Sequence, residues 1–258
     1  MNMITDNLWE EIKDLIPVKK SKFGRPEMCP RKALNAIFFV LKTGIQWHYL
    51  PSEMGKASTV HGKFRKWIKL EVFDLIMQKA CLFYETINGK VSIWYATDAS
   101  SSKAPFAHTW SGRNPTDRGK QGIKKSIIID RKGAPLSITI GSANQHDSTL
   151  FPKTLRAFHQ FNPSQIKLMA ADSAYDDKKT RNTCKKANFI LLASTNNRNN
   201  HEVKNYKPRH RWIVERTFGW LNWNRSIKFC WTKLEDSYLA FCHLACSIQL
   251  FRMSGVFV

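Results

Sequence analysis

Two short apolar runs, each followed directly by an aspartate, decide how this chain folds. Val91–Asp98 reads VSIWYATD and Ile166–Asp172 reads IKLMAAD. Runs of this length and composition predict buried strands, Val91–Thr97 and Ile166–Ala171, with an acid at the carboxyl end of each. Ligands of open α/β sheets bind at the carboxyl ends of the strands, so Asp98 and Asp172 would face one another if their strands are neighbours.

The segments around these two runs complete a predicted mixed sheet. Ser126–Ile129 and Pro135–Ile140 are predicted strands joined by the turn Asp130–Gly133. Later segments alternate between types: helices are expected at Ser148–Phe161, Asp176–Lys186, Arg209–Leu221 and Leu234–Phe251, and a further strand at Phe189–Ala193. Three strands followed by alternating helices and strands predict an α/β domain with a mixed sheet.

Residues 1–90 have helical periodicity instead, so a domain boundary is expected near residue 91. Thr5, Pro30 and Ser58 are the expected first residues or caps of three helices, and Gly44 the end of the second. The third helix has Lys63, Arg65 and Lys66 outside its apolar stripe. Two short helices around a turn are typical of a helix-turn-helix unit whose second helix enters the major groove. The alternative is a helical bundle with a solvated basic face.

The charge of the chain points to a polyanionic partner. Lys and Arg number 41 against 20 Asp and Glu, a formal net charge of +21. Nucleic acid is the leading partner because neutralised phosphates release counterions; a ribosome-associated protein or a membrane-surface binder are the alternatives. The scattered cysteines disfavour a zinc knuckle, and the absence of a signal pattern or long apolar run predicts a reducing cytoplasm and no membrane partner.

A third carboxylate completes a candidate metal site. Glu215 lies in the helical stretch Trp212–Phe218, whose apolar residues would hold it against the sheet. Together with Asp98 and Asp172 it could bind two Mg²⁺ or Mn²⁺ ions, which suit phosphodiester cleavage. Each acid could instead have a purely structural role. Asp98 could cap a serine turn, Asp172 could start a turn, and Glu215 could do no more than pair with Arg211 on its own helix.

Several residues are candidates for DNA contact. A basic cluster between the first two strands would grip phosphates near the cut, unless it is only a solvated loop; it comprises Arg113, Arg118, Lys120, Lys124 and Lys125. Trp223, with polar neighbours, could stack an unpaired base, the alternative being core packing. His146 is expected to make local hydrogen bonds.

Five motifs in order along the chain resemble the DDE transposases of bacterial insertion sequences, within the four/five superfamily and its compact members. They are Thr97–Ser100 (TDAS), Asn114–Lys120 (NPTDRGK), Ala143–Ser148 (ANQHDS), Ala171–Asp176 (ADSAYD) and Arg211–Phe218 (RWIVERTF). Leu34–Ile37 and Gly44–Trp47 also resemble the helical domain that precedes the catalytic domain there. The resemblance implies a ribonuclease-H-like catalytic fold with Asp98, Asp172 and Glu215 as its three acids.

The chain departs from the family pattern at two positions. Pro208 stands where some relatives have Tyr, and Asn222 where they have Lys, so the family's contacts to the transposon end are not carried over at these two positions. Equivalent phosphate contacts could come from Arg209, Arg211, Arg216 and Arg225. The segment between Phe189 and Arg209 is too short for the large inserted domain of other transposases.

The sequence therefore predicts a helical, helix-turn-helix-like DNA-binding domain at 1–90 and a ribonuclease-H-like DDE catalytic domain with C-terminal helices at 91–258. The expected enzyme cuts double-stranded DNA at transposon ends and transfers the freed strand to a target. A homodimer in the synaptic complex and a nucleoid-associated, cytoplasmic location follow from that activity. The alternatives are a nuclease without strand transfer and a catalytically inactive DNA-binding repressor.

Overall fold

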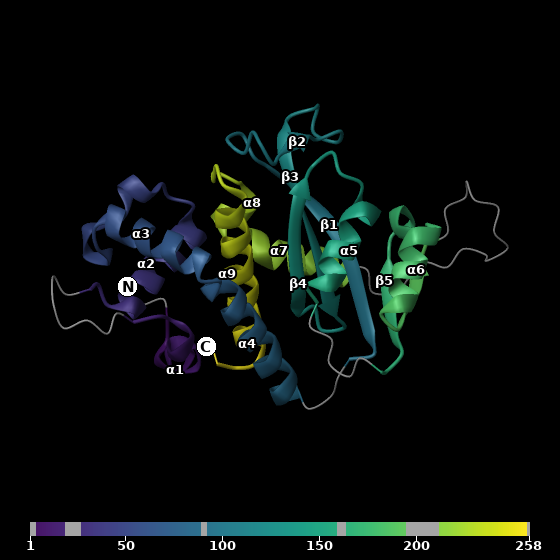
Figure 1. Cartoon of the computed structure of the whole chain (residues 1–258), viewed down its shortest axis with the longest axis horizontal. Coiled ribbons are helices and arrows are strands. Elements are labelled where there is room, and N and C mark those ends of the chain that lie inside the picture. Colours follow the sequence, from purple (N-terminus) through teal and green to yellow (C-terminus); the bar gives the residue numbers. More distant parts are fainter. Residues whose placement is uncertain (1–3, 19–26, 89–91, 159–163, 195–211, 257–258) are drawn as a thin grey trace.

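A mixed six-stranded sheet forms the centre of the computed structural model, which describes residues 4–18, 27–88, 92–158, 164–194 and 212–256 (Figure 1). The strands are β1 (Trp94–Lys103), β2 (Gly112–Arg113), β3 (Gln121–Asp130), β4 (Pro135–Ser142), β5 (Lys167–Ala171) and β6 (Phe189–Ala193). Their order is β2-β3-β1-β5-β6, with β4 also pairing with β3. β3 is antiparallel to β1, β2 and β4, whereas β1, β5 and β6 are mutually parallel. The expected mixed α/β class is confirmed.

The first strand is longer than the sequence predicts. β1 does not end before Asp98 but continues to Lys103, and Asp98 pairs with Ile127 in the middle of the ladder. Serines have no strong strand preference, so the run Ser100–Ser102 does not read as a strand. Pairing with β3 keeps this run extended, since Ser100 pairs with Lys125 and Ser102 with Ile123.

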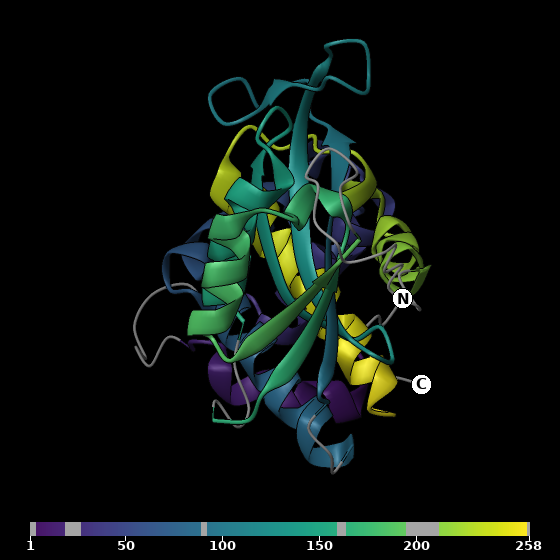
Figure 2. The same ribbon diagram turned by 90° about the vertical axis from the view of Figure 1, so that its right-hand side faces the viewer.

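Helices cover both faces of the sheet (Figures 1 and 2). α5 (Asp147–Arg156) and α6 (Lys178–Lys186) pack on one face, and α7 (Trp212–Asn222) and α9 (Glu235–Met253) on the other. The short helix α8 (Arg225–Lys228), which was not predicted, joins α7 to α9. α5 begins one residue earlier than expected and ends at Arg156 rather than Phe161, and α6 begins at Lys178 after a 3-10 turn at Ser173–Tyr175.

The N-terminal part is helical, as expected, and consists of α1 (Asp6–Ile12), α2 (Pro30–Thr43), α3 (Ala57–Lys69) and α4 (Val72–Asn88). Thr5 caps α1 by accepting a hydrogen bond from Leu8 N at 3.3 Å. Ser58 does not cap α3, because the helix begins at Ala57 and Lys56 is the cap residue. Residues 44–56, which include two short 3-10 helices, connect α2 to α3; this connection is longer than the turn of a helix-turn-helix unit.

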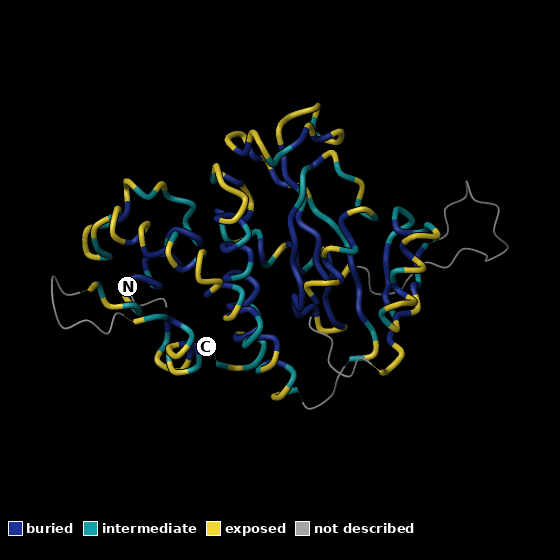
Figure 3. The backbone as a smooth tube through the Cα atoms, viewed as in Figure 1, coloured by how far each residue is buried: buried dark blue, intermediate teal, exposed yellow. Residues whose placement is uncertain are grey.

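The helical part and the sheet share one continuous core. α4 packs along α9, and α2 packs on α8. Phe64 of α3 stacks on Phe241 of α9, with ring centroids 4.8 Å apart. Figure 3 shows buried backbone running from the N-terminal helices through α9 into the sheet. No helix in the described ranges is long and apolar enough to span a membrane.

Candidate active site

Asp98 and Asp172 occupy equivalent positions on neighbouring parallel strands. β1 and β5 pair in register up to Ala96 and Ala170, and each aspartate lies two residues beyond that pair. Asp172 keeps an extended backbone (φ −76°, ψ 168°), so the alternation of side chains continues through it. Neighbouring strands are about 5 Å apart where they pair, so the register brings the two aspartates to the same level of the sheet.

Strand alternation also tells which face of the sheet the two acids share. Ser100 pairs with Lys125, whose ammonium donates to Asn222 Oδ1 of α7 at 3.1 Å. Asp98 lies two residues before Ser100 and therefore points to the same face, the one that α7 covers. The matching position of Asp172 puts its carboxyl group on that face too.

Each aspartate is oriented by the residue that follows it. Asp98 Oδ1 accepts a hydrogen bond from Ala99 N at 2.8 Å, and Asp172 Oδ1 accepts one from Ser173 N at 2.5 Å. Asp172 thereby caps the 3-10 turn at Ser173–Tyr175, so the expectation that it could start a turn is confirmed. Asp98 sits within a strand and caps no serine turn.

Glu215 lies in the first turn of α7, which packs against β1. Thr217 Oγ1 anchors this helix by donating to Gly133 O at 2.8 Å, in the β3–β4 turn, and Asn222 anchors its other end through Lys125. The Glu215 side chain is exposed. In the described part of the chain, no three acidic, histidine or cysteine residues form a preassembled metal-binding group, so the role of Glu215 stays a prediction.

A hollow of about 780 Å³ begins at Ala99, the residue after Asp98, and none of the three candidate acids is among its lining residues. β1 continues from Thr97 to Lys103 beyond its last pair with β5, and the hollow is lined along this stretch by Ala99–Lys103. Its other walls come from the β2–β3 loop, from the start of α5, and from Asn222, Lys228 and Phe229. The hollow therefore lies beyond the carboxyl end of the paired part of β1, the edge at which ligands of open α/β sheets bind.

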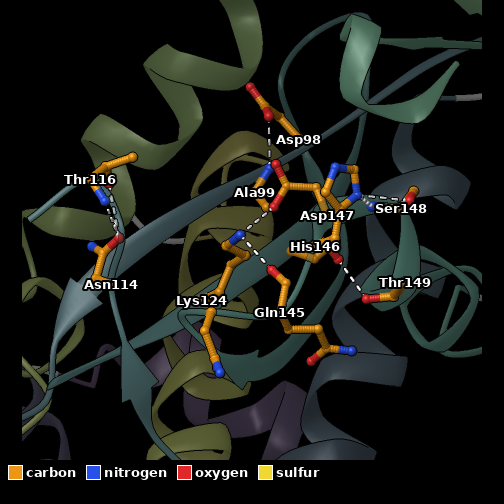
Figure 4. Close-up of polar contacts among 12 residues, drawn as sticks. Asp98, Ala99, Asn114, Thr116, Lys124, Gln145, His146, Asp147, Ser148 and Thr149 are labelled. Carbon is orange, nitrogen blue, oxygen red and sulfur yellow. Dashed lines mark hydrogen bonds and ion pairs between the residues drawn. The ribbon is translucent and has the colours of Figure 1, made fainter. Parts of the chain in front are cut away.

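One wall of the hollow carries a compact ion pair (Figure 4). Lys124 Nζ lies 2.6 Å from Asp147 Oδ1 and donates to Gln145 O at 2.7 Å. His146 caps α5, with Nδ1 2.9 Å from Ser148 Oγ, so its expected local bonding is confirmed. Lys124 thus neutralises Asp147 within the protein.

Tyr175, three residues after Asp172, is a buried residue near the candidate site that the sequence did not single out. Its side chain is completely buried and stacks edge-on against Phe151 of α5. Burial, and next the charges of Asp98 and Asp147, raise the pKa of its hydroxyl well above the usual value. The buried hydroxyl therefore stays protonated under the influence of these two charges. The available signal was its position three residues after Asp172 within the motif ADSAYD.

The structure divides the predicted DNA-contacting lysines and arginines into buried and exposed groups. Lys125 is fully buried in the core, and Lys63 is buried in an ion pair with Glu27 at 2.7 Å, so neither lies on the surface as predicted. Arg65 pairs with Asp236 at 2.6 Å. The exposed members are Lys66, Arg113, Arg118, Lys120 and Arg225, and Arg211 lies outside the described residues.

The tryptophans of the C-terminal part differ in the same way. Trp223 is 75% exposed, as base stacking requires. Trp220 is half-buried, and the Arg216 guanidinium lies 4.6 Å from its ring centroid and 4.8 Å from that of Trp212. Arg216 also donates to Lys132 O at 2.8 Å, so it braces α7 against the β3–β4 turn.

A mixed sheet of this strand order, with acids at equivalent positions on its two central parallel strands, defines a protein of the ribonuclease-H-like class. Family models place it more narrowly. A model described as a transposase DDE domain matches residues 93–250, and a model of putative transposases of the IS4/5 family matches residues 4–77. The chain belongs to the DDE transposase family and is a DDE-type transposase.

Two curated relatives come from Burkholderia cepacia. The putative transposase for insertion sequence element IS402 is 28% identical over 144 residues, which cover 54% of this chain and 67% of the relative. An uncharacterized 16.2 kDa protein of the same element is 34% identical over 122 residues, covering 44% of this chain and 81% of that protein.

Solved transposase structures show a more distant likeness. A piggyBac transposase synaptic complex with hairpin DNA has a TM-score of 0.36 at 11% identity, covering 78% of this chain and 50% of that one. The Mos1 mariner paired-end complex with Mn has a TM-score of 0.29 at 11% identity, covering 94% and 84%. These scores are low, and the fold class follows from the strand order of the sheet itself.

Proposed function

We propose that Asp98, Asp172 and Glu215 are the catalytic carboxylates of this transposase and hold two divalent metal ions, Mg²⁺ or Mn²⁺. The observation that carries the proposal is the matched position of Asp98 and Asp172 on adjacent parallel strands. Their donor atoms are hard carboxylate oxygens, which suit both ions. Glu215 would join from α7, the helix that covers the same face.

The distances between the three carboxylates are expected to be shorter when metal ions are bound. Three carboxylates without a cation repel one another, so no tight cluster is favoured until positive charge arrives. Bound ions would supply activation of a water or 3′-hydroxyl and stabilisation of the leaving oxygen. The hydrogen bonds of α7 to Gly133 and Lys125 hold this helix against the sheet, so Glu215 would reach the ions by a movement of its side chain.

The remaining residues of the site have positioning roles in this proposal. The exposed side chains of Arg113, Arg118 and Lys120 extend from β2 and the β2–β3 loop and would hold DNA phosphates over the hollow. The Lys124–Asp147 pair removes one negative charge from the wall that a phosphate must approach. Lys66 of α3 and Arg225 of α8 would hold the same DNA farther along.

The proposed substrate is double-stranded DNA, both the ends of the element and the target. Residues 1–90 would chiefly bind the ends, and residues 91–258 would cut and join them. A homodimer is proposed for the synaptic complex, because two ends must be joined together. Such activity belongs in the cytoplasm, at the nucleoid.

The test is cleavage of supercoiled plasmid carrying the element ends in Mg²⁺. Asp98→Ala should reduce nicking roughly a hundredfold or more, whereas Asp117→Ala, which removes an acid that lines the hollow, should leave most activity. Equal nicking by Asp98→Ala and the parent would overturn the catalytic assignment. Pre-cut ends then separate the alternatives: a transposase joins them to target DNA, a simple nuclease does not, and a repressor binds them without either reaction.

A further inference from the structure

Three exposed aromatic rings lie side by side at one end of the molecule. Phe106 is 46% exposed, Phe229 37% and Trp231 53%. The Trp231 ring centroid lies 5.9 Å from that of Phe106 and 6.2 Å from that of Phe229, whose plane it nearly parallels at 27°. We call these three residues the aromatic patch. Large rings exposed together leave apolar surface in water, which marks a binding surface.

Hydrogen bonds fix the backbone beneath the patch. Cys230 N, between two of its rings, donates to Lys103 O at the end of β1 at 2.9 Å. Trp110 Nε1, from the segment that contains Phe106, donates to Lys233 O at 2.9 Å. The β1–β2 loop and the segment after α8 therefore meet at one end of the fold (Figures 1 and 2). The two backbone segments that carry the rings are therefore joined to each other without a ligand.

The surroundings of the patch are cationic. Lys103, Lys228 and Lys233 are exposed within two or three residues of the rings along the chain. In the described part of the chain no carboxylate pairs with Lys228 or Lys233, and Lys103 lies 3.7 Å from Asp117 in an exposed pair. Exposed pairs of this kind contribute little stability. Flat apolar rings beside available ammonium groups complement a ligand that has both bases and phosphates.

The patch also adjoins the candidate active site. Lys103, Lys228 and Phe229 line the same hollow as Ala99, which follows Asp98. β1 runs directly from Asp98 to Lys103, and at about 3.3 Å per residue this distance is roughly 16 Å. A DNA strand with a phosphate at Asp98 would reach the patch within a few nucleotides.

From this arrangement we propose that the aromatic patch stacks unpaired bases of single-stranded DNA next to the cleavage site. The proposal rests on the proposed function for the position of the cut, and it adds a substrate feature: the DNA is unpaired beside the scissile phosphate. Stacking on aromatic side chains tolerates any base, because every base has a π-face. The patch would hold the strand that the carboxylates act on, without reading its sequence.

The experiment measures binding without divalent metal, so that no strand is cut. One probe is a blunt 20-base-pair duplex, and the other is the same duplex with a 3′ extension of five thymidines and 2-aminopurine at the first unpaired position. The parent should bind the extended probe more tightly and quench its fluorescence. Trp231→Ala and Phe106→Ala should weaken binding of the extended probe roughly tenfold and leave the blunt duplex unchanged.

Two matched variants control for side effects. Trp231→Phe keeps a ring and should retain most of the quenching, and Tyr49→Ala, which removes an exposed ring outside the patch, should change neither probe. The proposal would be overturned if Trp231→Ala and Phe106→Ala bound the extended probe as tightly as the parent. It would also be overturned if they lost the same affinity for the blunt duplex as for the extended probe. The proposal would also be overturned if sedimentation showed that these two variants differ from the parent in oligomeric state, because the patch would then be an interface between copies of the chain. The carboxylate assignment fails separately, if Asp98→Ala cuts DNA as well as the parent does, and that result would leave these binding results intact.

Discussion

The ammonium group of Lys125 is buried between the sheet and α8. It donates to Ser102 Oγ at 2.7 Å, to Asn222 Oδ1 at 3.1 Å and to Ile227 O at 3.2 Å. One side chain thereby joins β1, the end of α7 and α8. Burial lowers its pKa from 10.5 to about 8, against a smaller opposing effect of nearby cysteines.

This shifted pKa predicts a specific pH dependence of stability. Because the folded pKa is below the unfolded value, the unfolded chain binds more protons between about pH 8 and 10.5, and the unfolding free energy rises with pH there. The rise should total about 3 kcal/mol. Urea unfolding of the parent and of Lys125→Met, compared at pH 7 and 10.5, isolates it.

An exposed lysine provides the control. Lys120→Met should follow the parent across the whole range, because its side chain is solvated. If Lys125→Met showed the same pH slope as the parent, the buried ammonium would not be the source of the rise.

At the scale of the element, the end of α2 sets how the N-terminal helices meet the catalytic part. Gly44 ends α2 in the left-handed region (φ 68°), and its N–H bonds to Val40 O at 2.9 Å. A Cβ added there would lie 2.9 Å from Arg225 Cβ of α8. Ser226 Oγ, also of α8, donates to Val40 O at 2.8 Å. The glycine thus permits both the helix end and the close approach of α8.

We therefore expect Gly44→Ala to lower the unfolding free energy by about 1–3 kcal/mol, from the left-handed backbone and from crowding against Arg225. Gly62→Ala is the matched control, since Gly62 lies inside α3 with open space around its Cα. That substitution should raise stability by up to about 1 kcal/mol. Thermal unfolding of both variants measures the difference, and a stable Gly44→Ala would contradict the assigned packing.

Local patterns predicted most elements because their signals lie within a few residues of one another. Phe189–Ala193 is a strand with the predicted bounds, and Thr5, Pro30 and Gly44 mark helix ends as expected. The failures involve partners far away in the chain. The end of β1 is extended by pairing with β3, and α8 is a single turn that packs on α2.

The same distinction applies to the site. Asp98 and Asp172 could be placed from the ends of their apolar runs, and the register of β1 and β5 brings them to one level. The burial of Lys63 and Lys125 could not be predicted, because their partners Glu27, Ser102 and Asn222 come from other elements. The burial of Tyr175 could not be predicted either, because it depends on the packing of Phe151 of α5 against its ring.

At the scale of the whole molecule, the chain has a net charge of +21, whereas the proposed site consists of carboxylates. The positive field attracts DNA, and the proposed catalytic acids would repel its phosphates unless cations are bound among them. The core shared by α4, α9 and the sheet gives the N-terminal helices a fixed position relative to that site. DNA held by both parts would therefore be presented to Asp98 and Asp172 in one orientation.

Mn²⁺ binding, followed by electron paramagnetic resonance, tests the central claim most directly. The parent should bind Mn²⁺ at a site that Asp98→Asn and Asp172→Asn each abolish and that Glu215→Gln weakens. Asp236→Asn, whose carboxylate pairs with Arg65 away from the site, should bind as the parent does. Unaltered Mn²⁺ binding in both aspartate variants would contradict the assignment of these residues as the metal-holding acids.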